Sequence, residues 1–313
     1  MIYDTIIIGG GPTGTASAVY AARKQMKTLL ITESFGGQSI VSNDIDNWIG
    51  DIKLTGFELA QKFEKHVKAQ SNIDIIEGDL ANKITKIDSV KNYPIYQVDT
   101  ENGKSFQAKT LILGLGAKRR KLGLEREEEL TGKGVAYCAT CDAPFFSNVP
   151  VGVVGSGNSG LESALDLLSY ASEVYLFNRT ENIKGDPDKV DKLNTYPNFK
   201  GFIHNSQVSK FIGETKLESI EYTNLINNEV KSLPLQGLFI EIGSIPNSEM
   251  VKDLVNINSY GEIIIDHKYS STSAPGIFAA GDVTDEAYKQ NNISAGDAVK
   301  ATLSAYHYIH NLK

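Results

Sequence analysis

The chain has 313 residues, of which 41% are apolar and 22% charged, and this is the composition of an ordinary globular protein. Its length allows two domains of about 150 residues each. The net charge of −7 argues against a nucleic-acid-binding protein, because such a protein needs a basic surface to neutralise phosphates. We therefore expect no nucleic-acid partner.

The sequence also gives no sign of secretion or membrane insertion. Its N-terminus lacks the basic region and long apolar stretch of a signal peptide. No run approaches the roughly 20 apolar residues that a membrane helix needs. Two cysteines are too few for a secreted disulfide scaffold. We expect a cytoplasmic protein with no membrane partner.

The first 33 residues have the pattern of a dinucleotide-binding unit. The β-branched run at residues 6–8 is typical of a buried strand and leads into the Gly-X-Gly-X-X-Gly loop at residues 9–14. An alanine-rich helix and a second strand at Thr28–Thr32 follow. In such a loop the glycines make the turn, admit a pyrophosphate and allow helix–strand contact, while an acid after the second strand binds a ribose hydroxyl. We predict that a dinucleotide is bound by Gly9, Gly11, Gly14 and Glu33. The alternative is a doubly wound fold with an unoccupied turn.

A loop-rich stretch and a run of β-structure come next. Taken alone, residues 36–38 and 47–48 indicate only turns and the burial of the sole tryptophan. Apolar spacing predicts an amphipathic helix over residues 54–70. Short strands are expected at residues 73–77, 81–87, 95–100 and 110–113, with Gly103 in a hairpin turn.

The only two cysteines, Cys138 and Cys141, are separated by two residues and followed by Asp142. The chemistry of a Cys-X-X-Cys pair depends on how readily one thiol becomes a thiolate. If this segment opens a helix, the partial positive charge of the helix N-terminus lowers a thiol pKa. Asp142 could then move a proton to or from the departing thiol. We predict these three residues as the catalytic group.

Two other interpretations of the cysteine pair are weaker. Two inert buried cysteines would have no reason to occur at this spacing. A structural zinc site needs two more ligands, and the two-residue gap between His307 and His310 is shorter than the usual three to five. We expect no metal site.

A second dinucleotide pattern follows the cysteines. A strand at residues 150–154 leads into a loop that contains Gly155, Gly157 and Gly160, and a helix at 161–169 and a strand at Glu173–Phe177 follow. Two such units around a redox dithiol suggest a flavin that collects an electron pair and a nicotinamide that delivers it. We expect the three glycines to bind the nicotinamide dinucleotide.

The end of the second strand in this unit gives mixed signals about the nicotinamide. Asn178 stands where an acid would select NAD. Arg179 and Lys184 could accept the 2′-phosphate of NADP, whereas Glu181 would favour NAD. In the alternative interpretation Arg179 and Lys184 are only surface charges.

The C-terminal third is expected to complete both units. Short strands within residues 208–224 and 235–242 close the second unit, and residues 243–247 suit a return hinge. A small-residue strand ends at Gly281-Asp282, where an aspartate could hydrogen-bond the polyol chain of a flavin, and a helix at 295–312 closes the chain. We therefore predict an α/β fold with two Rossmann-like, three-layer domains. Residues 1–116 plus 245–313 form the FAD-binding domain, and residues 117–244, inserted in it, form a nicotinamide-binding-type domain that carries the cysteines.

Together these residues resemble the low-molecular-weight thioredoxin reductases over essentially the whole chain. The stretch Cys138-Ala-Thr-Cys141-Asp142 is similar to that family's active site almost letter for letter. The residues at 36–38, 47–48 and 281–283 and the second glycine loop follow in the family's order and spacing. Residues 288–305 resemble the flavoprotein component of alkyl hydroperoxide reductases equally well.

The resemblance implies a homodimer that binds FAD. In the family the second cysteine, here Cys141, exchanges electrons with the flavin, the first, here Cys138, attacks the disulfide of thioredoxin or a similar small protein, and Asp142 is the acid–base group. One domain swings against the other, with hinges expected here at residues 114–118 and 243–247. The FAD ligands predicted on this basis are Gly9, Gly11, Gly14, Glu33, Gly37, Gln38, Asn47, Gly281, Asp282 and Gln290.

One departure from the family concerns the electron donor. The family's NADPH signature is His-Arg-Arg followed three residues later by Arg, whereas this chain has Asn178-Arg179-Thr180 and then Lys184. Lysine does not replace the planar, bidentate guanidinium group at a phosphate site. Some relatives take electrons from reduced ferredoxin instead. We expect a flavin-dependent disulfide reductase with NAD(P)H as the donor and ferredoxin as the alternative.

Three alternative functions can be weighed against a disulfide reductase. A peroxiredoxin-reducing flavoprotein normally needs an extra thioredoxin-like N-terminal module, and we expect none here because residue 6 already begins the flavin strand. A non-catalytic FAD redox sensor would bind FAD tightly and have a titratable dithiol but negligible turnover with any thioredoxin. A peroxide-forming oxidase would not need the cysteine pair.

Overall fold

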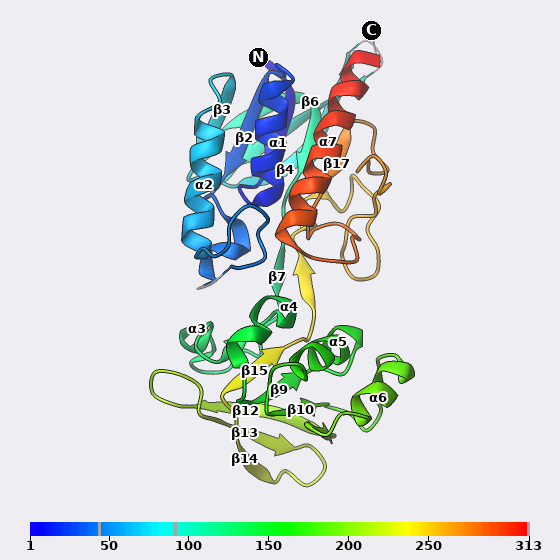
Figure 1. The fold of residues 1–313 in the computed structure, drawn as a ribbon. Coiled ribbons are helices and arrows are strands. Elements are labelled where there is room, and N and C mark those ends of the chain that lie inside the picture. The colour runs from blue at the N-terminus through cyan, green and yellow to red at the C-terminus, as the bar shows by residue number, and fades with distance from the viewer. Residues whose placement is uncertain (43–44, 91–92, 312–313) are drawn as a thin grey trace. The chain divides into compact units, whose positions relative to one another are not determined.

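The computed structural model describes residues 1–42, 45–90 and 93–311 (Figure 1). The chain forms two compact units. Unit 1 comprises Met1–Lys118 and Ile245–Lys313, and unit 2 comprises Arg119–Ser244. Within the described ranges, no helix combines the length and apolar character that crossing a membrane requires.

Unit 1 is built on a sheet with the strand order β3-β2-β1-β6-β5-β4, in which β17 also pairs with β6. The strands β1, β2, β3, β6 and β17 run parallel, and β4 and β5 join them as an antiparallel hairpin extension. Their bounds are β1 Ile2–Ile8, β2 Thr28–Thr32, β3 Ile73–Glu77, β4 Ala81–Val90, β5 Tyr93–Thr100, β6 Ser105–Leu113 and β17 Ile277–Ala279.

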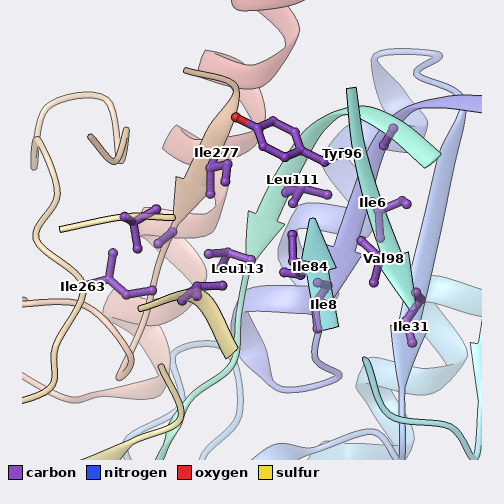
Figure 2. Close-up of a cluster of buried hydrophobic side chains, with 14 of the residues drawn as sticks. Ile6, Ile8, Ile31, Ile84, Tyr96, Val98, Leu111, Leu113, Ile263 and Ile277 are labelled. Carbon is purple, nitrogen blue, oxygen red and sulfur yellow. The ribbon is translucent and has the colours of Figure 1, made fainter. Parts of the chain in front are cut away.

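Both faces of this sheet are buried, which explains the unbroken apolar run at its centre. Successive strand residues point to opposite faces. Ile7 therefore packs with the helices α1 (Pro12–Arg23), α2 (Gly56–Lys68) and α7 (Asn291–Asn311), which lie together in Figure 1. Ile6 and Ile8 pack in the opposite cluster with Val98 and Ile263 (Figure 2). A strand covered on both faces has no polar face to alternate with.

Unit 2 has a parallel sheet in the order β11-β10-β9-β15-β8 and a separate antiparallel sheet, β12-β13-β14. The strands are β8 Val135–Ala136, β9 Pro150–Val154, β10 Glu173–Phe177, β11 Phe199–Ile203, β12 Ser206–Ile212, β13 Ser219–Asn224, β14 Val230–Pro234 and β15 Gly237–Ile240. The helices are α3 Glu127–Leu130, α4 Ala139–Asp142, α5 Asn158–Leu167 and α6 Pro187–Asn194. The α/β fold class predicted from the sequence, with two Rossmann-like domains, is confirmed.

The chain passes between the units through two short strands that pair with each other, β7 (Ala117–Arg119) and β16 (Ser244–Pro246). Next to them, the backbone N–H of Arg120 donates to the carbonyl oxygen of Gly243 at 3.0 Å. The described ranges also contain short 3₁₀ turns: η1 Gly37–Val41, η2 Ala143–Phe146 and η3 Glu249–Val251.

Several element bounds differ from the sequence-based expectations. The helix expected at 161–169 begins at Asn158, and the closing helix begins at Asn291 rather than 295. The strand expected at 81–87 extends to Val90. Sequence patterns did not predict α6, in which Leu193 is buried among polar neighbours, or β11, which contains Gly201 and a register shift in its pairing with β10. Both elements lack the clear apolar periodicity on which such predictions depend.

Candidate functional site

The glycine loop of unit 1 adopts the tight turn that its sequence predicts. Gly9 has φ +112°, and a Cβ atom built on it would lie 2.2 Å from the carbonyl oxygen of Gly114. A Cβ atom on Gly14 would lie 1.7 Å from the carbonyl oxygen of Gly9. Only glycine avoids both conflicts. The turn therefore brings β1 directly onto the N-terminus of α1, where Gly11 is the N-cap residue.

Two further predicted glycines lie against this turn. A Cβ atom on Gly37 would be 3.2 Å from the Cα atom of Gly11, so these two backbones approach without side chains between them. Gly281 has φ +76°, and its Cβ atom would be 2.4 Å from Oγ1 of Thr13. Three distant segments of the chain thus meet at the N-terminus of α1, and each contributes a glycine there.

The predicted polar ligands of FAD lie in the same unit, and two of them are in contact. Nδ2 of Asn47 donates to Oε1 of Gln290 at 3.3 Å, and Nδ2 of Asn292 donates to the carbonyl oxygen of Asn47 at 2.7 Å. These bonds fix the loop before α2 to the start of α7. Glu33 is exposed at the end of β2, Gln38 is exposed in η1, and Asp282 is half-buried after Gly281.

These residues fit a dinucleotide. The glycine-lined cradle lies at the N-terminus of a 12-residue helix, at the carboxyl ends of parallel strands, where open α/β sheets bind such ligands. Glu33 follows β2, the position from which an acid reaches a ribose. The hydrogen-bonded pair Asn47 and Gln290 adds amide donors and acceptors in the same unit.

The glycine loop of unit 2 repeats this geometry. Gly155 has φ +119°, and its Cβ atom would lie 2.3 Å from the carbonyl oxygen of Glu241. A Cβ atom on Gly160 would lie 1.9 Å from the carbonyl oxygen of Gly155, the same close approach as that of Gly14 to Gly9. Gly157 is the N-cap residue of α5. The loop therefore fits a second dinucleotide.

Asn178 stands where an acid would bind the ribose of NAD, but its side chain hydrogen-bonds to the loops around it. Its Oδ1 accepts from Oγ of Ser156 at 2.7 Å. Its Nδ2 donates to the carbonyl oxygens of Thr180 and Asn182 at 2.6 and 3.0 Å. The side chain is buried, and both amide hydrogens are used. Asn178 therefore shapes the ribose edge rather than contacting the ribose through its amide donors.

Three charged side chains are exposed at this edge: Arg179, Glu181 and Lys184. Oε2 of Glu181 accepts from Nδ2 of Asn205 at 2.6 Å, which fixes the position of the carboxylate. The backbone N–H groups of Lys184 and Gly185 donate to the carbonyl oxygen of Ser156 at 3.2 and 2.8 Å. The segment that carries the charges is thus attached to the glycine loop.

Cys138, Cys141 and Asp142 lie on one helical turn. The two sulfur atoms form a disulfide, and both cysteines are half-buried. Cys138 is the N-cap residue of α4, and its carbonyl oxygen accepts from the N–H groups of Cys141 and Asp142 at 3.2 and 3.0 Å. The expected helix is present but has only four residues before η2 begins. Its influence on the thiols is therefore that of a few local N–H groups rather than of a long helix dipole.

Sequence reasoning missed Glu127, which supports the segment before the cysteines. Its buried carboxylate accepts from the N–H groups of Leu122, Gly123 and Leu124 at 2.7–3.2 Å. It also accepts from the hydroxyl of Tyr137 at 2.8 Å, and burial together with this carboxylate raises the pKa of Tyr137 well above its ordinary value. In the sequence this residue belongs to an acidic run that has the pattern of a solvated surface.

Sequence reasoning also missed Glu241, which directly follows β15. Oγ of Ser163 donates to its Oε1 at 2.8 Å, and its carboxylate accepts from the backbone N–H of Ala139. Burial raises the pKa of Glu241. No local sequence signal identifies this position, since its partners come from α4 and α5. Among the described residues, no group of three or more His, Cys, Asp or Glu side chains has the arrangement of a metal site.

Two dinucleotide cradles and a disulfide on one helical turn define a flavin- and nicotinamide-dependent disulfide oxidoreductase. The family model described as "Pyridine nucleotide-disulphide oxidoreductase" matches residues 3–300, and the chain belongs to that family. The family implies binding of FAD and a pyridine nucleotide. The resemblance to thioredoxin reductases and alkyl hydroperoxide reductase flavoproteins is confirmed.

Solved thioredoxin reductases have this fold. That of Streptococcus pyogenes MGAS5005 is 35% identical and superposes with a TM-score of 0.90, covering 99% of both chains. That of Giardia duodenalis is 26% identical with a TM-score of 0.89, covering 98% of this chain and 99% of its own.

Curated relatives of similar sequence carry other names. An alkyl hydroperoxide reductase protein of Staphylococcus aureus (strain MRSA252) is 39% identical over 307 residues, which are 98% of this chain and 59% of that protein. A protein named NADH dehydrogenase of Bacillus subtilis (strain 168) is 38% identical over 307 residues, 98% of this chain and 58% of that protein. The chain therefore spans less than two thirds of the length of these relatives.

Proposed function

We propose that the protein is a FAD-dependent disulfide reductase that takes electrons from NAD(P)H and passes them through the Cys138–Cys141 pair to thioredoxin or a similar small protein. The observation that carries the proposal is the disulfide on α4. It lies in a unit that has one dinucleotide cradle, and the other unit of the same chain provides a second cradle. When bound, FAD supplies a carrier that accepts a hydride equivalent and releases an electron pair to a disulfide.

The chain's own residues then carry out thiol–disulfide exchange. Two electrons and two protons convert the Cys138–Cys141 disulfide to two thiols. The Cys138 thiolate attacks the partner's disulfide, which forms a mixed disulfide and releases one partner thiolate. Cys141 attacks Cys138 in turn, so the internal disulfide re-forms and the partner leaves as a dithiol. Asp142 transfers the proton that the departing sulfur needs.

Between the two nicotinamides we favour NADH. A fixed carboxylate at Glu181 attracts ribose hydroxyls and repels a 2′-phosphate. The family's arginines are reduced here to Arg179, with Lys184 as a less suitable replacement. Two of the relatives are named NADH dehydrogenase, which agrees with this preference.

The Glu181→Gln variant tests the preference for NADH. Removing the negative charge should lower the KM for NADPH by about 3- to 10-fold, since a like-charge contact of this kind costs on the order of 1 kcal/mol at an exposed site. The KM for NADH should stay the same or rise. Steady-state kinetics with both donors measure this, and Glu229→Gln, a surface change on the β13–β14 hairpin, is the control. Unchanged KM values for NADPH would remove Glu181 from the specificity site.

Anaerobic flavin bleaching tests the donor class itself. We expect NADH to bleach the flavin within the mixing time, NADPH to do so more slowly, and reduced ferredoxin to be unnecessary. Bleaching by reduced ferredoxin, with none by either nicotinamide, would replace this proposal by a ferredoxin-dependent reductase.

Turnover with a disulfide substrate separates the enzyme from its rivals. Reduction of thioredoxin at many turnovers per flavin supports the proposal, while flavin bleaching without any thioredoxin turnover would favour a redox sensor. We further propose a cytoplasmic homodimer. Sedimentation of the FAD-loaded protein should give twice the monomer mass of 34.1 kDa.

A further inference from the structure

Glu241 connects three elements around the dithiol. It directly follows β15, it accepts from Ser163 on α5 at 2.8 Å, and it accepts from the N–H of Ala139, the first residue of α4. Ala139 is the neighbour of Cys138 in the chain. The carboxylate therefore occupies one of the N-terminal amide groups of the turn that carries both cysteines.

Charged and hydrogen-bonding groups from α4, α5 and β7 surround Glu241. Asp142 lies on α4, and its charge adds to the effect of burial in raising the pKa of Glu241. Arg119 on β7 and the two hydrogen-bond donors, Ser163 and Ala139, act in the opposite direction. On α5, Asp166 accepts from Oγ1 of Thr140 at 3.4 Å, so a third carboxyl faces α4.

This arrangement bears on the reduced dithiol. A thiolate at a helix N-terminus is normally stabilised by free N–H groups and destabilised by a nearby anion. Here a carboxylate takes the Ala139 N–H and adds a negative charge beside a turn that already contains Asp142. Both effects disfavour ionisation of the two thiols while Glu241 is itself ionised.

We propose that Glu241 is a positioning residue of the dithiol: its carboxylate fixes the first turn of α4, and its charge restrains thiolate formation at Cys138 and Cys141. The proposal rests on the proposed function only in treating this pair as redox-active. It concerns a proton equilibrium of the reduced protein and is independent of which donor or partner is used.

The full-length protein, reduced with dithiothreitol and then freed of it, provides the test. Alkylation by iodoacetamide is followed across the pH range, and mass spectrometry quantifies the label on each cysteine. In Glu241→Gln the pH of half-maximal rate should fall by about 0.5–1 unit, which raises the rate near neutral pH about 3- to 10-fold, since thiolate population changes tenfold per unit. Gln keeps an oxygen that can accept a hydrogen bond and loses the charge.

Two further variants make the result decisive. Ser163→Ala removes a donor that favours the ionised carboxylate, so it should shift the alkylation profile in the same direction by a smaller amount, and it decides the question if Glu241→Gln does not fold. Glu229→Gln, an exposed carboxylate of the same unit that pairs with Lys231, should leave the profile unchanged. A wild-type profile in Glu241→Gln, or an equal shift in Glu229→Gln, would overturn the proposal.

The outcome is distinguishable from failure of the proposed function. A shifted alkylation profile without thioredoxin turnover would leave Glu241 in its role and refute the enzyme's assignment. Full thioredoxin turnover with an unshifted alkylation profile would support the enzyme's assignment and refute the role of Glu241.

Discussion

Gly9 shows how a single residue decides whether the first dinucleotide cradle forms. Its Cβ atom would lie 2.2 Å from a backbone oxygen, which cannot move as a flexible side chain could. We expect Gly9→Ala to purify without bound FAD, measured by flavin absorbance per chain. Gly103→Ala is the matched control, because it has a similar positive φ of +77° and, among the described residues, no atom within 4 Å of its Cβ position. That variant should cost about 1 kcal/mol and stay yellow.

Serine substitutions at the two cysteines should give opposite visible spectra. If Cys141 faces the flavin, Cys138→Ser leaves a Cys141 thiolate that forms a charge-transfer band with oxidised FAD, whereas Cys141→Ser forms none. Visible spectra of the two variants measure this directly. A band in Cys141→Ser alone would mean that the roles are reversed.

At this scale the sequence predicts what depends on neighbouring residues. The steric needs of Gly14 and Gly160 arise from Gly9 and Gly155, which belong to the same glycine loops, so a local pattern reveals them. The contact of Gly9 with Gly114 is not local, and Gly9 is found only because it belongs to the loop pattern. Glu241 could not be found in this way, because its hydrogen-bond partner Ser163 is 78 positions away. The sequence predicts Asn178 at the position where an acid would select NAD, and only the structure shows that its amide donates to two loop carbonyls.

At the scale of elements, the pairing of β1 with β6 contains a pH-dependent contact. Asp4 accepts from Nζ of Lys109 at 2.6 Å and from the N–H of Lys27 at 3.0 Å. Burial would raise the pKa of Asp4, but these bonds outweigh it and hold the pKa below its usual 3.8. A carboxyl with a lowered pKa contributes stability above its unfolded-state pKa, and this contribution is lost as the pH falls through the folded-state value.

Asp4→Asn should therefore lower the free energy of unfolding by about 1 kcal/mol at neutral pH, since the contact is charge-assisted and partly exposed. The difference from the wild type should vanish well below pH 3.8. Urea unfolding at several pH values, followed by circular dichroism, measures this. Asp51→Asn should have a smaller effect, because its partner Lys62 is more exposed than Lys109. If the difference in the free energy of unfolding stayed the same at acid pH, this role of the Asp4 carboxylate would be contradicted.

Elements with a strong pattern were predictable, and elements with a weak one were not. The strands β1 and β9 combine apolar runs with the glycine loops that follow them, and α2 has an apolar stripe that begins after the capping box of Thr55 and Glu58. By contrast, α4 is a single turn and β8 has two residues, so neither is long enough to show a period. Their existence depends on tertiary packing.

At the scale of the whole molecule, we propose that turnover requires the units to move about residues 114–118 and 243–247. Gly116 and Gly243 have φ values of +64° and +93°, and the described part of the chain places no atom within 4 Å of either Cβ position. The double variant Gly116→Ala/Gly243→Ala should fold with about 1 kcal/mol of strain at each site. We expect normal FAD content and a kcat for thioredoxin reduction several-fold below wild type. An unchanged kcat would place the hinge elsewhere.

The backbone N–H of Asn247 donates to the carbonyl oxygen of Gly116 at 3.0 Å, and Nδ2 of Asn247 donates to the carbonyl oxygen of Leu115 at 2.8 Å. The two ends of unit 1 that flank the inserted unit are therefore immediate neighbours, already joined by hydrogen bonds. Such adjacency is what domain insertion requires, because an ancestral single-domain protein can accept a foreign module there without separating its own core. By the same argument, unit 2 could be replaced by another module at this junction while the core of unit 1 is retained.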